Sequence, residues 1–382
     1  MSRRILFDGL NLSLERGTGI ATYTRMLAQI ARDLGHQIGV VYSSATRPAK
    51  NPLMREIAFF DTREAAPVAA AKGVWDAVRD IVRAPLGVQP RAVNLSGTVI
   101  TEQFRTRLPL QDQMFVARSL FANARRYFSW TGQFTDLAFD VAPDILHCTY
   151  QLPLRAKQAC NVYTIHDLVP LRLPYATLDN KRLIYRLLRK IAAEADHIVT
   201  VSENSKRDII QLLGVSEERV TNTYEAVDFP SRLLERPDDV VAEQLASSYG
   251  LDFQGYLLFY GALEPKKNVA RLIDAFLLSA VDIPLVITGA GGWGNQTEAR
   301  AIEDLRNEDR LQGRRRIYHF EYVSLPMLVT LIRGARAVLF PSLYEGFGLP
   351  VLEAMLLGTP VLTSRTSSLP EIAGDAALYV DP

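Results

Sequence analysis

Two glutamates flanking a glycine-containing loop mark the part of the sequence with the clearest chemistry. Glu345 precedes the run Gly-Phe-Gly-Leu-Pro, and Glu353 follows it. The apolar residues 338–341 before this loop predict a buried strand, and the proline at 350 suits the first turn of a helix. Carboxylates at these places can accept hydrogen bonds from sugar or ribose hydroxyls. The backbone N–H groups at the helix start suit a phosphate.

Basic and imidazole side chains follow other strand-like runs. Lys266 and Lys267 lie in the loop 261–268, directly after the apolar run 256–260. Such a lysine pair fits either a solvated turn or a site where fixed cations bind an anion. His166 ends another such run, and the carboxyl ends of parallel strands are where α/β sheets bind ligands. The absence of any Asp-x-Asp pair from the sequence agrees with a site that needs no metal.

The rest of the sequence predicts the elements that position these side chains. Apolar runs alternate with amphipathic segments through most of the chain, a pattern typical of parallel α/β structure. A helix is predicted at about 20–34, with Ile20, Leu27 and Leu34 on one face, and another begins after Ser202. Strands are predicted at 4–8, 38–42, 145–147, 162–166, 197–202, 256–260, 284–288, 317–319 and 337–341.

Length and composition predict two domains. A chain of 382 residues exceeds one ordinary hydrophobic core. An acidic, proline-containing stretch at 235–239 separates the two series of strands, so we predict domains at 1–235 and 236–382. Between about 45 and 140 the pattern weakens, and we predict helices and loops inserted in the first domain.

Together these motifs resemble family 4 of the retaining glycosyltransferases. The spacing from Glu345 to Glu353 matches the family's E-x7-E motif, and the loop 261–268 resembles its basic phosphate-binding loop. The resemblance implies the GT-B fold, in which two Rossmann-like domains with parallel sheets face each other across a cleft. A final helix in that family crosses back onto the first domain. Because this chain ends on the strand-like run 377–382, we expect that helix to be missing.

The resemblance also implies roles for individual residues. Glu345 positions the sugar, Lys267 holds the departing diphosphate, and His166 faces the donor sugar. Many members carry an arginine directly after the loop glycine. This chain has Ala262 there, and Lys266 is the cation that would substitute for it. Further donor contacts are implied at Gly17, Gly19, Ser202, Lys266, Gly346, Phe347, Gly348, Leu349, Glu353 and Glu371. Helix capping would equally explain Ser202, and a first-turn helix carboxylate would explain Glu371.

The implied reaction is a retaining transfer of a hexose from a nucleotide-sugar to a glycan or a lipid-diphosphate-linked acceptor, with no metal and no cofactor. The loops at 261–268 and 367–371 look most like those of bacterial mannosyltransferases that assemble surface polysaccharide, including O-antigen. GDP-mannose is therefore the first expectation, and UDP-linked hexoses remain open. Two other functions also remain open, a nucleotide-sugar epimerase or phosphorylase on the same fold and a non-catalytic nucleotide-sugar-binding protein.

Composition limits the classes of binding partner and the cellular compartment that we expect. A net charge of +1 without a dense basic stripe argues against nucleic acid. The first 230 residues are mildly basic, and a basic amphipathic helix is predicted around 181–191. Such a helix fits a solvated protein surface or the inner face of an anionic membrane. The N-terminus lacks the pattern of a signal peptide, and Cys148 and Cys160 have no metal-ligand spacing. We therefore expect a cytoplasmic protein, with peripheral contact at the inner membrane left open.

Overall fold

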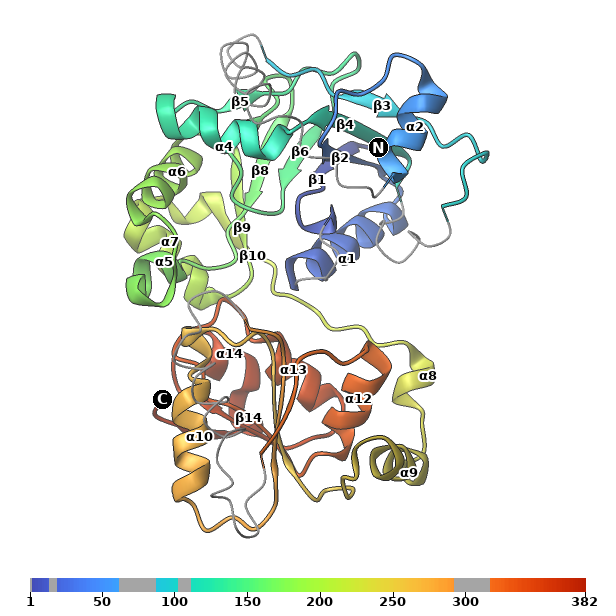
Figure 1. Ribbon diagram of the computed structural model, residues 1–382. Coiled ribbons are helices and arrows are strands. Elements are labelled where there is room, and N and C mark those ends of the chain that lie inside the picture. The colour runs from blue at the N-terminus through green and yellow to red at the C-terminus, as the bar shows by residue number, and fades with distance from the viewer. Residues whose placement is uncertain (1, 14–18, 62–86, 102–110, 292–316) are drawn as a thin grey trace, which may run out of the picture. The chain divides into compact units, whose positions relative to one another are not determined.

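A computed structural model of the protein describes residues 2–13, 19–61, 87–101, 111–291 and 317–382 (Figure 1). By their contacts the residues fall into two units. Unit 1 consists of Met1–Ile165, Arg182–Thr200 and Ile209–Thr221. Unit 2 consists of His166–Lys181, Val201–Asp208 and Asn222–Pro382. The boundary predicted at 235/236 stays a prediction.

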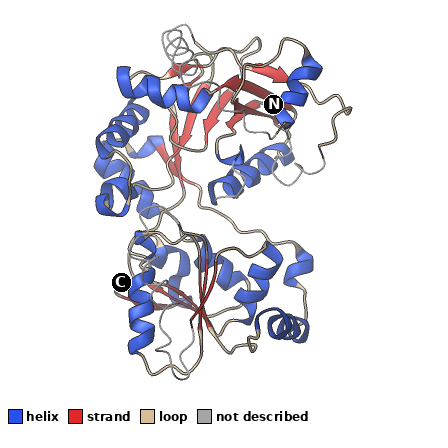
Figure 2. Ribbon diagram, in the orientation of Figure 1, coloured by secondary structure: helices blue, strands red, loops and turns tan. Residues whose placement is uncertain are grey.

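An eight-stranded sheet forms the centre of unit 1 (Figure 2). Its strand order is β10-β9-β8-β6-β1-β2-β4-β3. The pairs from β9 to β4 are parallel, and β3 pairs antiparallel with β4. The strands are β1 Arg4–Asp8, β2 Gln37–Ser44, β3 Arg91–Val93, β4 Gln113–Arg118, β6 Ile145–Cys148, β8 Cys160–Thr164, β9 His197–Thr200 and β10 Val220–Asn222. A separate parallel pair joins β5 Thr135–Asp136 and β7 Leu154–Arg155.

The helices that lie wholly or mainly in unit 1 are α1 Gly19–Asp33, α2 Pro52–Phe60, α4 Leu120–Thr131 and α6 Lys181–Glu194. Helix α7 Glu203–Leu213 begins in unit 2 and ends in unit 1. Small residues of α1, including Ala21, Thr24 and Ala28, are buried, whereas Leu34 beyond its end is exposed. The predicted helix is confirmed within one residue at each end. Small side chains allow the helix backbone to approach its neighbours closely, and apolar periodicity alone does not reveal this.

The segment 45–140 contains more than the predicted helices and loops. Strand β4 pairs with β2 in parallel over six residues and so extends the central sheet, and β3 follows it at the edge. The prediction missed these strands because 113–118 mixes polar and apolar residues and lies among weak patterns. Its pairing depends on the partner strand rather than on local sequence. The parts of this segment at 62–86 and 102–110 lie outside the described residues.

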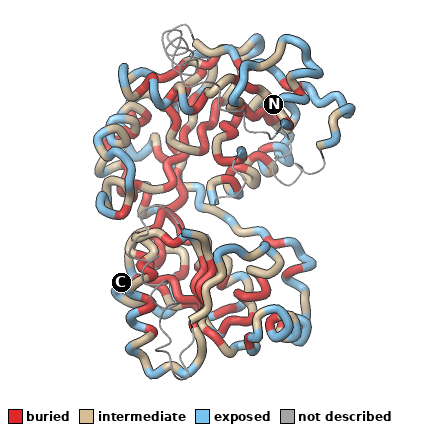
Figure 3. The backbone as a smooth tube through the Cα atoms, in the orientation of Figure 1, coloured by how far each residue is buried: buried red, intermediate tan, exposed pale blue. Residues whose placement is uncertain are grey.

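A six-stranded parallel sheet forms the centre of unit 2, in the order β13-β12-β11-β14-β15-β16. The strands are β11 Leu257–Tyr260, β12 Leu285–Thr288, β13 Ile317–Phe320, β14 Ala337–Phe340, β15 Val361–Ser364 and β16 Leu378–Val380. The helices are α5 Val169–Arg172, α8 Ser231–Leu234, α9 Asp238–Tyr249, α10 Val269–Leu278, α12 Leu325–Gly334, α13 Leu349–Leu356 and α14 Leu369–Ala373. The central strands are buried, whereas the outer faces of the helices are exposed (Figure 3).

The strand order of unit 2 reverses at its centre. Strand β11 is followed in sequence by β12 on one side, while β14 lies on its other side and continues to β15. The loops after β11 and β14 therefore leave in opposite directions, and such a switch point is where open α/β sheets bind ligands. These are the loops that carry Lys266, Lys267 and Glu345.

Candidate functional site

The loop after β14 is fixed by hydroxyl groups of the segment before α14. The backbone N–H of Glu345 donates to Ser367 Oγ at 3.0 Å. The hydroxyl of Ser368 donates to the carbonyl oxygens of Glu345 at 3.1 Å and Phe347 at 2.6 Å. Gly348 has a φ of +116°, which favours glycine, and α13 starts at the next residue. The predicted sequence of strand, glycine loop and helix is confirmed.

Two lysines of the loop after β11 surround the Glu345 carboxylate. Lys267 Nζ lies 2.6 Å from Oε1, and Lys266 Nζ lies 3.9 Å from Oε2. The Lys267 ammonium also lies 4.6 Å from the centroid of the Phe340 ring at the end of β14. Glu345 is only 5% exposed, so its carboxylate interacts with these lysines largely shielded from water. Burial makes the pair interaction strong and costly to break.

The surrounding charges set the protonation states of this cluster. Burial alone would raise the pKa of Glu345, but Lys267 and Lys266 outweigh it and hold that pKa below its ordinary value. Burial would lower the pKa of Lys266, but Glu345, Asp167 and Glu264 outweigh it and raise that pKa. Lys266 Nζ lies 3.9 Å from both Asp167 and Glu264. At neutral pH both groups are charged.

A pH dependence of stability follows from the lowered pKa of Glu345. A carboxylate with a depressed pKa stabilises the fold above its unfolded pKa, near 4.5, and loses that contribution as pH falls through its folded value. Glu345→Gln should lower stability by about 3 kcal/mol at pH 7, because it removes one partner of a buried ion pair. Thermal unfolding between pH 7 and pH 3 should show that the difference in stability between Glu345→Gln and the unmodified protein becomes smaller as pH falls.

Glu353 provides a control of opposite sign. Burial raises its pKa, and Tyr260 and Lys267 only partly offset this. A carboxyl with a raised pKa loses stabilisation as pH rises through its folded value. Glu353→Gln should therefore gain stability relative to the unmodified protein as pH rises. If the stability difference between Glu345→Gln and the unmodified protein became larger toward acid pH, the assigned charges would be wrong.

Glu353 lies one turn inside α13, close to the end of β11. The Tyr260 hydroxyl at that strand end donates to the carbonyl oxygen of Pro350 at 2.6 Å. Tyr260 also lowers the pKa of Glu353, against the larger effect of burial. The two glutamates of the predicted motif thus have different environments, since Glu345 pairs with cations and Glu353 with a phenol. Sequence reasoning missed Tyr260, which appeared only as an apolar strand residue.

Three loops meet at Gly346. The hydroxyls of Ser202 and Ser205 donate to its carbonyl oxygen at 2.6 Å and 3.2 Å. Ser205 also donates to the carbonyl oxygen of His166 at 3.0 Å. A Cβ atom on Gly346 would lie 2.4 Å from that same His166 oxygen, so only glycine permits this approach. The predicted loops containing His166, Ser202 and Gly346 are therefore brought together within unit 2.

Two predicted donor residues also make helix-capping contacts. The Ser205 backbone N–H donates to Ser202 Oγ at 3.0 Å, as expected of a helix N-cap. The carboxylate of Glu371 accepts the backbone N–H groups of Glu203 at 2.7 Å and Asn204 at 3.1 Å. Glu371 thus lies at the positive end of α7, where a carboxylate is favoured. Donor roles for both residues stay predictions.

The predicted N-terminal glycine loop belongs to unit 1. Gly19 is the first residue of α1, and Gly17 lies outside the described residues. Near this helix, at the carboxyl end of β1, Asp8 Oδ2 accepts the backbone N–H and the hydroxyl of Thr149 at 2.5 Å and 2.9 Å. The structure therefore brings most predicted donor residues into unit 2 and leaves Gly19 in unit 1.

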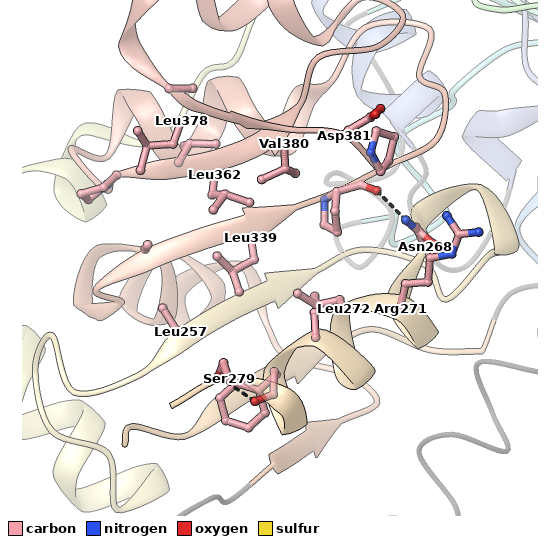
Figure 4. Close-up of a pocket in the computed structure, with 18 of the residues that line it drawn as sticks. Leu257, Asn268, Arg271, Leu272, Ser279, Leu339, Leu362, Leu378, Val380 and Asp381 are labelled. Atoms are coloured by element: carbon pink, nitrogen blue, oxygen red, sulfur yellow. Dashed lines mark hydrogen bonds between the residues drawn. The ribbon is translucent and has the colours of Figure 1, made fainter. Parts of the chain in front are cut away.

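A groove of about 1050 Å³ lies between α10 and the sheet of unit 2 (Figure 4). Mostly apolar residues line it, among them Leu272, Leu339 and Leu378, with Asn268 and Asp381 at one end. None of the predicted donor residues that the structure describes lines this groove. Within the described ranges, no cluster of three or more His, Cys, Asp or Glu residues could hold a metal ion. The same ranges contain no helix that is long and apolar enough to span a membrane.

Comparison with solved structures defines the fold class. Anabaena HepE in complex with UDP and glucose aligns with a TM-score of 0.62 and 16% sequence identity, over 100% of this chain and 86% of that one. Two Rossmann-like units with parallel sheets give this protein the GT-B fold of glycosyltransferases. The fold predicted from the resemblance is confirmed.

Family models identify the chain further. Residues 98–229 match the model described as Glycosyltransferase Family 4, and residues 247–382 match Glycosyl transferases group 1. The chain therefore contains a domain of the Glycosyltransferase Family 4 type followed by one of the Glycosyl transferases group 1 type. O-antigen chain mannosyltransferase B of Escherichia coli is 34% identical over 61% of this chain. O-antigen chain mannosyltransferase RfbU of Salmonella typhimurium is 27% identical over 62%. The matches span only 60% and 61% of those two relatives.

Proposed function

We propose that this protein transfers a hexose from a nucleotide-sugar to an acceptor, with retention of configuration and without a metal ion. The observation that carries the proposal is the charge cluster of Lys266, Lys267 and Glu345 at the switch point of unit 2. The matches to two glycosyltransferase family models support the reaction type. The cluster supplies both fixed cations for a diphosphate and a carboxylate for sugar hydroxyls.

Lys267 and Lys266 hold the departing diphosphate in this proposal. When the glycosidic bond breaks, its electron pair remains on the phosphate oxygen, and negative charge grows there. Fixed ammonium groups therefore stabilise the transition state, where this charge develops, more than they stabilise the bound donor. This difference lowers the barrier to transfer. The backbone N–H groups at the start of α13, where Gly348 and Leu349 lie, add donors and the positive end of the helix. No metal ion is needed for this step.

The carboxylates and the imidazole hold the rest of the donor. Glu345 accepts hydrogen bonds from sugar hydroxyls, with Gly346 and Phe347 shaping the loop around it, and Glu353 accepts from the ribose. His166 contacts the donor sugar. The acceptor hydroxyl attacks the anomeric carbon from the face that the diphosphate leaves, and a donor phosphate oxygen takes its proton. We place the donor mainly on unit 2 and the acceptor on unit 1, and Gly19 of unit 1 stays a predicted donor contact.

We propose GDP-mannose as the donor and a glycan or lipid-diphosphate-linked glycan as the acceptor. Support comes from the similarity to mannosyltransferases whose names refer to O-antigen chains. The relative solved with UDP and glucose supports a nucleotide-sugar site in this fold and keeps UDP-hexoses as competing donors. A direct comparison of donors therefore tests this part of the proposal.

A thermal-shift panel of GDP, UDP, ADP and their sugar conjugates, with and without EDTA, tests the donor site. A ligand that binds only the folded state stabilises it by about 2.7 kcal/mol at 100 times its Kd. We expect GDP and GDP-mannose to give the largest shifts, unchanged by EDTA. Shifts that vanish in EDTA would contradict the metal-free site, and a panel without any shift would contradict the donor site itself.

We further propose that α4 and α6 contact an anionic membrane surface. Arg126 and Trp130 on α4 and Arg182 and Tyr185 on α6 are exposed, and Trp130 is 64% exposed. The two helices lie together, because the Arg186 guanidinium on α6 donates to the carbonyl oxygen of Phe128 on α4 at 2.6 Å. Exposed aromatic and basic side chains on neighbouring helices suit the headgroup region of such a membrane.

Vesicle co-sedimentation tests this contact. Each basic residue near an anionic surface contributes about 1 kcal/mol, so the double variant Arg126→Glu, Arg182→Glu should bind anionic vesicles at least about tenfold more weakly. Arg47→Glu, another exposed arginine of unit 1, serves as the matched control and should bind as before. Equal binding to neutral and anionic vesicles, or no effect of the double variant, would refute the proposed contact.

A further inference from the structure

The connection from β10 to α8 has an unusual backbone conformation. Tyr224 has a φ of +56°, a left-handed conformation that side chains other than glycine rarely adopt and that costs about 1–2 kcal/mol. An Asx turn supports it, since the Tyr224 backbone N–H donates to Asn222 Oδ1 at 2.9 Å. Asn222 Nδ2 in turn donates to Glu203 Oε1 at 2.9 Å. Strain that neighbouring contacts maintain in this way often marks a functional position.

Glu225 follows this turn directly, and its side chain contacts His166. Its Oε1 lies 3.2 Å from His166 Nδ1, and its side chain is 9% exposed. A carboxylate can only accept hydrogen bonds, so Nδ1 must carry the proton. In a neutral imidazole the lone pair is then at Nε2. Glu225 therefore selects one of the two neutral tautomers of His166.

The two ends of His166 are held by different contacts. Its carbonyl oxygen accepts the Ser205 hydroxyl and lies against Gly346, which fixes the backbone. Glu225 contacts the ring, and the Tyr224 ring lies 6.4 Å from that of Phe347 in the loop after Glu345. The segment that begins at Asn222 thus contacts both the imidazole and the loop of the charge cluster.

We propose that Glu225 is a positioning residue that orients the His166 ring and fixes its tautomer for the transfer reaction. This inference rests on the proposed function and adds to it the residue that orients the histidine. Removal of a partner that orients a metal-bound histidine typically lowers activity by about 10- to 100-fold, and we expect an effect of similar size for His166. Glu225 acts through His166 and has no role of its own in the bond-breaking step.

A double-mutant cycle tests the coupling. Glu225→Ala should lower kcat by about tenfold or more while the KM for the donor changes less than about threefold. In a His166→Ala background the same change should cost less than about twofold, because the group it orients is gone. Glu225→Met, which keeps a similar volume but has no oxygen to accept the Nδ1–H hydrogen bond, covers the case in which the alanine variant unfolds. Asp228→Ala, an exposed acid on the same segment, is the matched control and should retain full activity.

The tautomer gives a readout that does not depend on activity. The chain has five histidines, and the ¹⁵N signals of His166 are assigned by their loss in His166→Ala. We expect an Nδ1-protonated ring in the unmodified protein and loss of this preference in Glu225→Met. If the unmodified protein transfers hexose but Glu225→Ala and His166→Ala lower kcat independently of each other, the positioning role alone is overturned. A ring protonated at Nε2 overturns it as well. Absence of transfer by the unmodified protein overturns the proposed function, and the role in transfer falls with it.

Discussion

Lys267→Ala is expected to lower the rate of hexosyl transfer by about 100- to 1000-fold, the size found when one fixed donor to a developing anion is removed. The Lys267 ammonium lies 2.6 Å from Glu345 at the end of the loop after β11, with the Phe340 ring 4.6 Å away. These contacts hold the cation in place before the donor binds. The loss should appear in kcat, measured with saturating nucleotide-sugar.

The alanine variant also leaves Glu345 with one lysine fewer in a buried site, which costs about 3–5 kcal/mol of stability. The double variant Lys267→Met, Glu345→Gln avoids this loss of stability, because it removes both charges and leaves no unpaired carboxylate. It should remain folded and inactive. Lys50→Ala, an exposed lysine of unit 1, should leave transfer unchanged. Full activity in the folded double variant would exclude Lys267 as the phosphate-binding cation.

Gly346→Ala is expected to destabilise unit 2 and to abolish transfer. The added Cβ would lie 2.4 Å from the His166 carbonyl oxygen and 3.0 Å from Asp167 Cβ. Because the first of these atoms belongs to the backbone, the loop that carries His166 has to move. Overpacking of this kind costs about 1–3 kcal/mol, and the displaced histidine loses its place beside Glu345's loop. Chemical unfolding and the transfer assay measure the two effects.

Gly358→Ala separates the clash from backbone strain. Gly358 has a φ of +76°, and a Cβ added there would meet no atom within 4 Å, so its substitution is strained but causes no clash. It should cost about 1 kcal/mol and keep activity. If Gly346→Ala proved as active as Gly358→Ala, the close contact between the loops of Gly346 and His166 would not matter for transfer.

The parts of the site that follow local rules could be predicted from the sequence. The run from 338 to 353 combines an apolar strand, a glycine loop and a proline at a helix start, and the structure reproduces all three. The basic loop after β11 was predictable for the same reason, since strand ends at a switch point carry ligands. Its pairing with Glu345 then follows from topology, because β11 and β14 are neighbours.

Contacts between segments far apart in sequence could not be predicted. Nothing local to Glu225 marks it as the partner of His166, which lies 59 residues earlier. Both oxygens of Glu371 accept N–H groups of α7, 167 and 168 residues away, although its position at the start of α14 was expected. Strand β4 was missed for the same reason, since it is defined by pairing with β2 rather than by its own pattern. Tertiary partners decide such cases.

The most direct test of the account is a transfer assay with radiolabelled GDP-mannose, parallel UDP-hexoses and a lipid-diphosphate-linked glycan acceptor in EDTA. We expect labelled glycan of retained anomeric configuration together with an equal amount of released nucleoside diphosphate. Conversion of the donor to a different nucleotide-sugar without release of the diphosphate would indicate an epimerase instead. Binding of the donor with no turnover by the full-length protein would contradict the assignment of transferase activity.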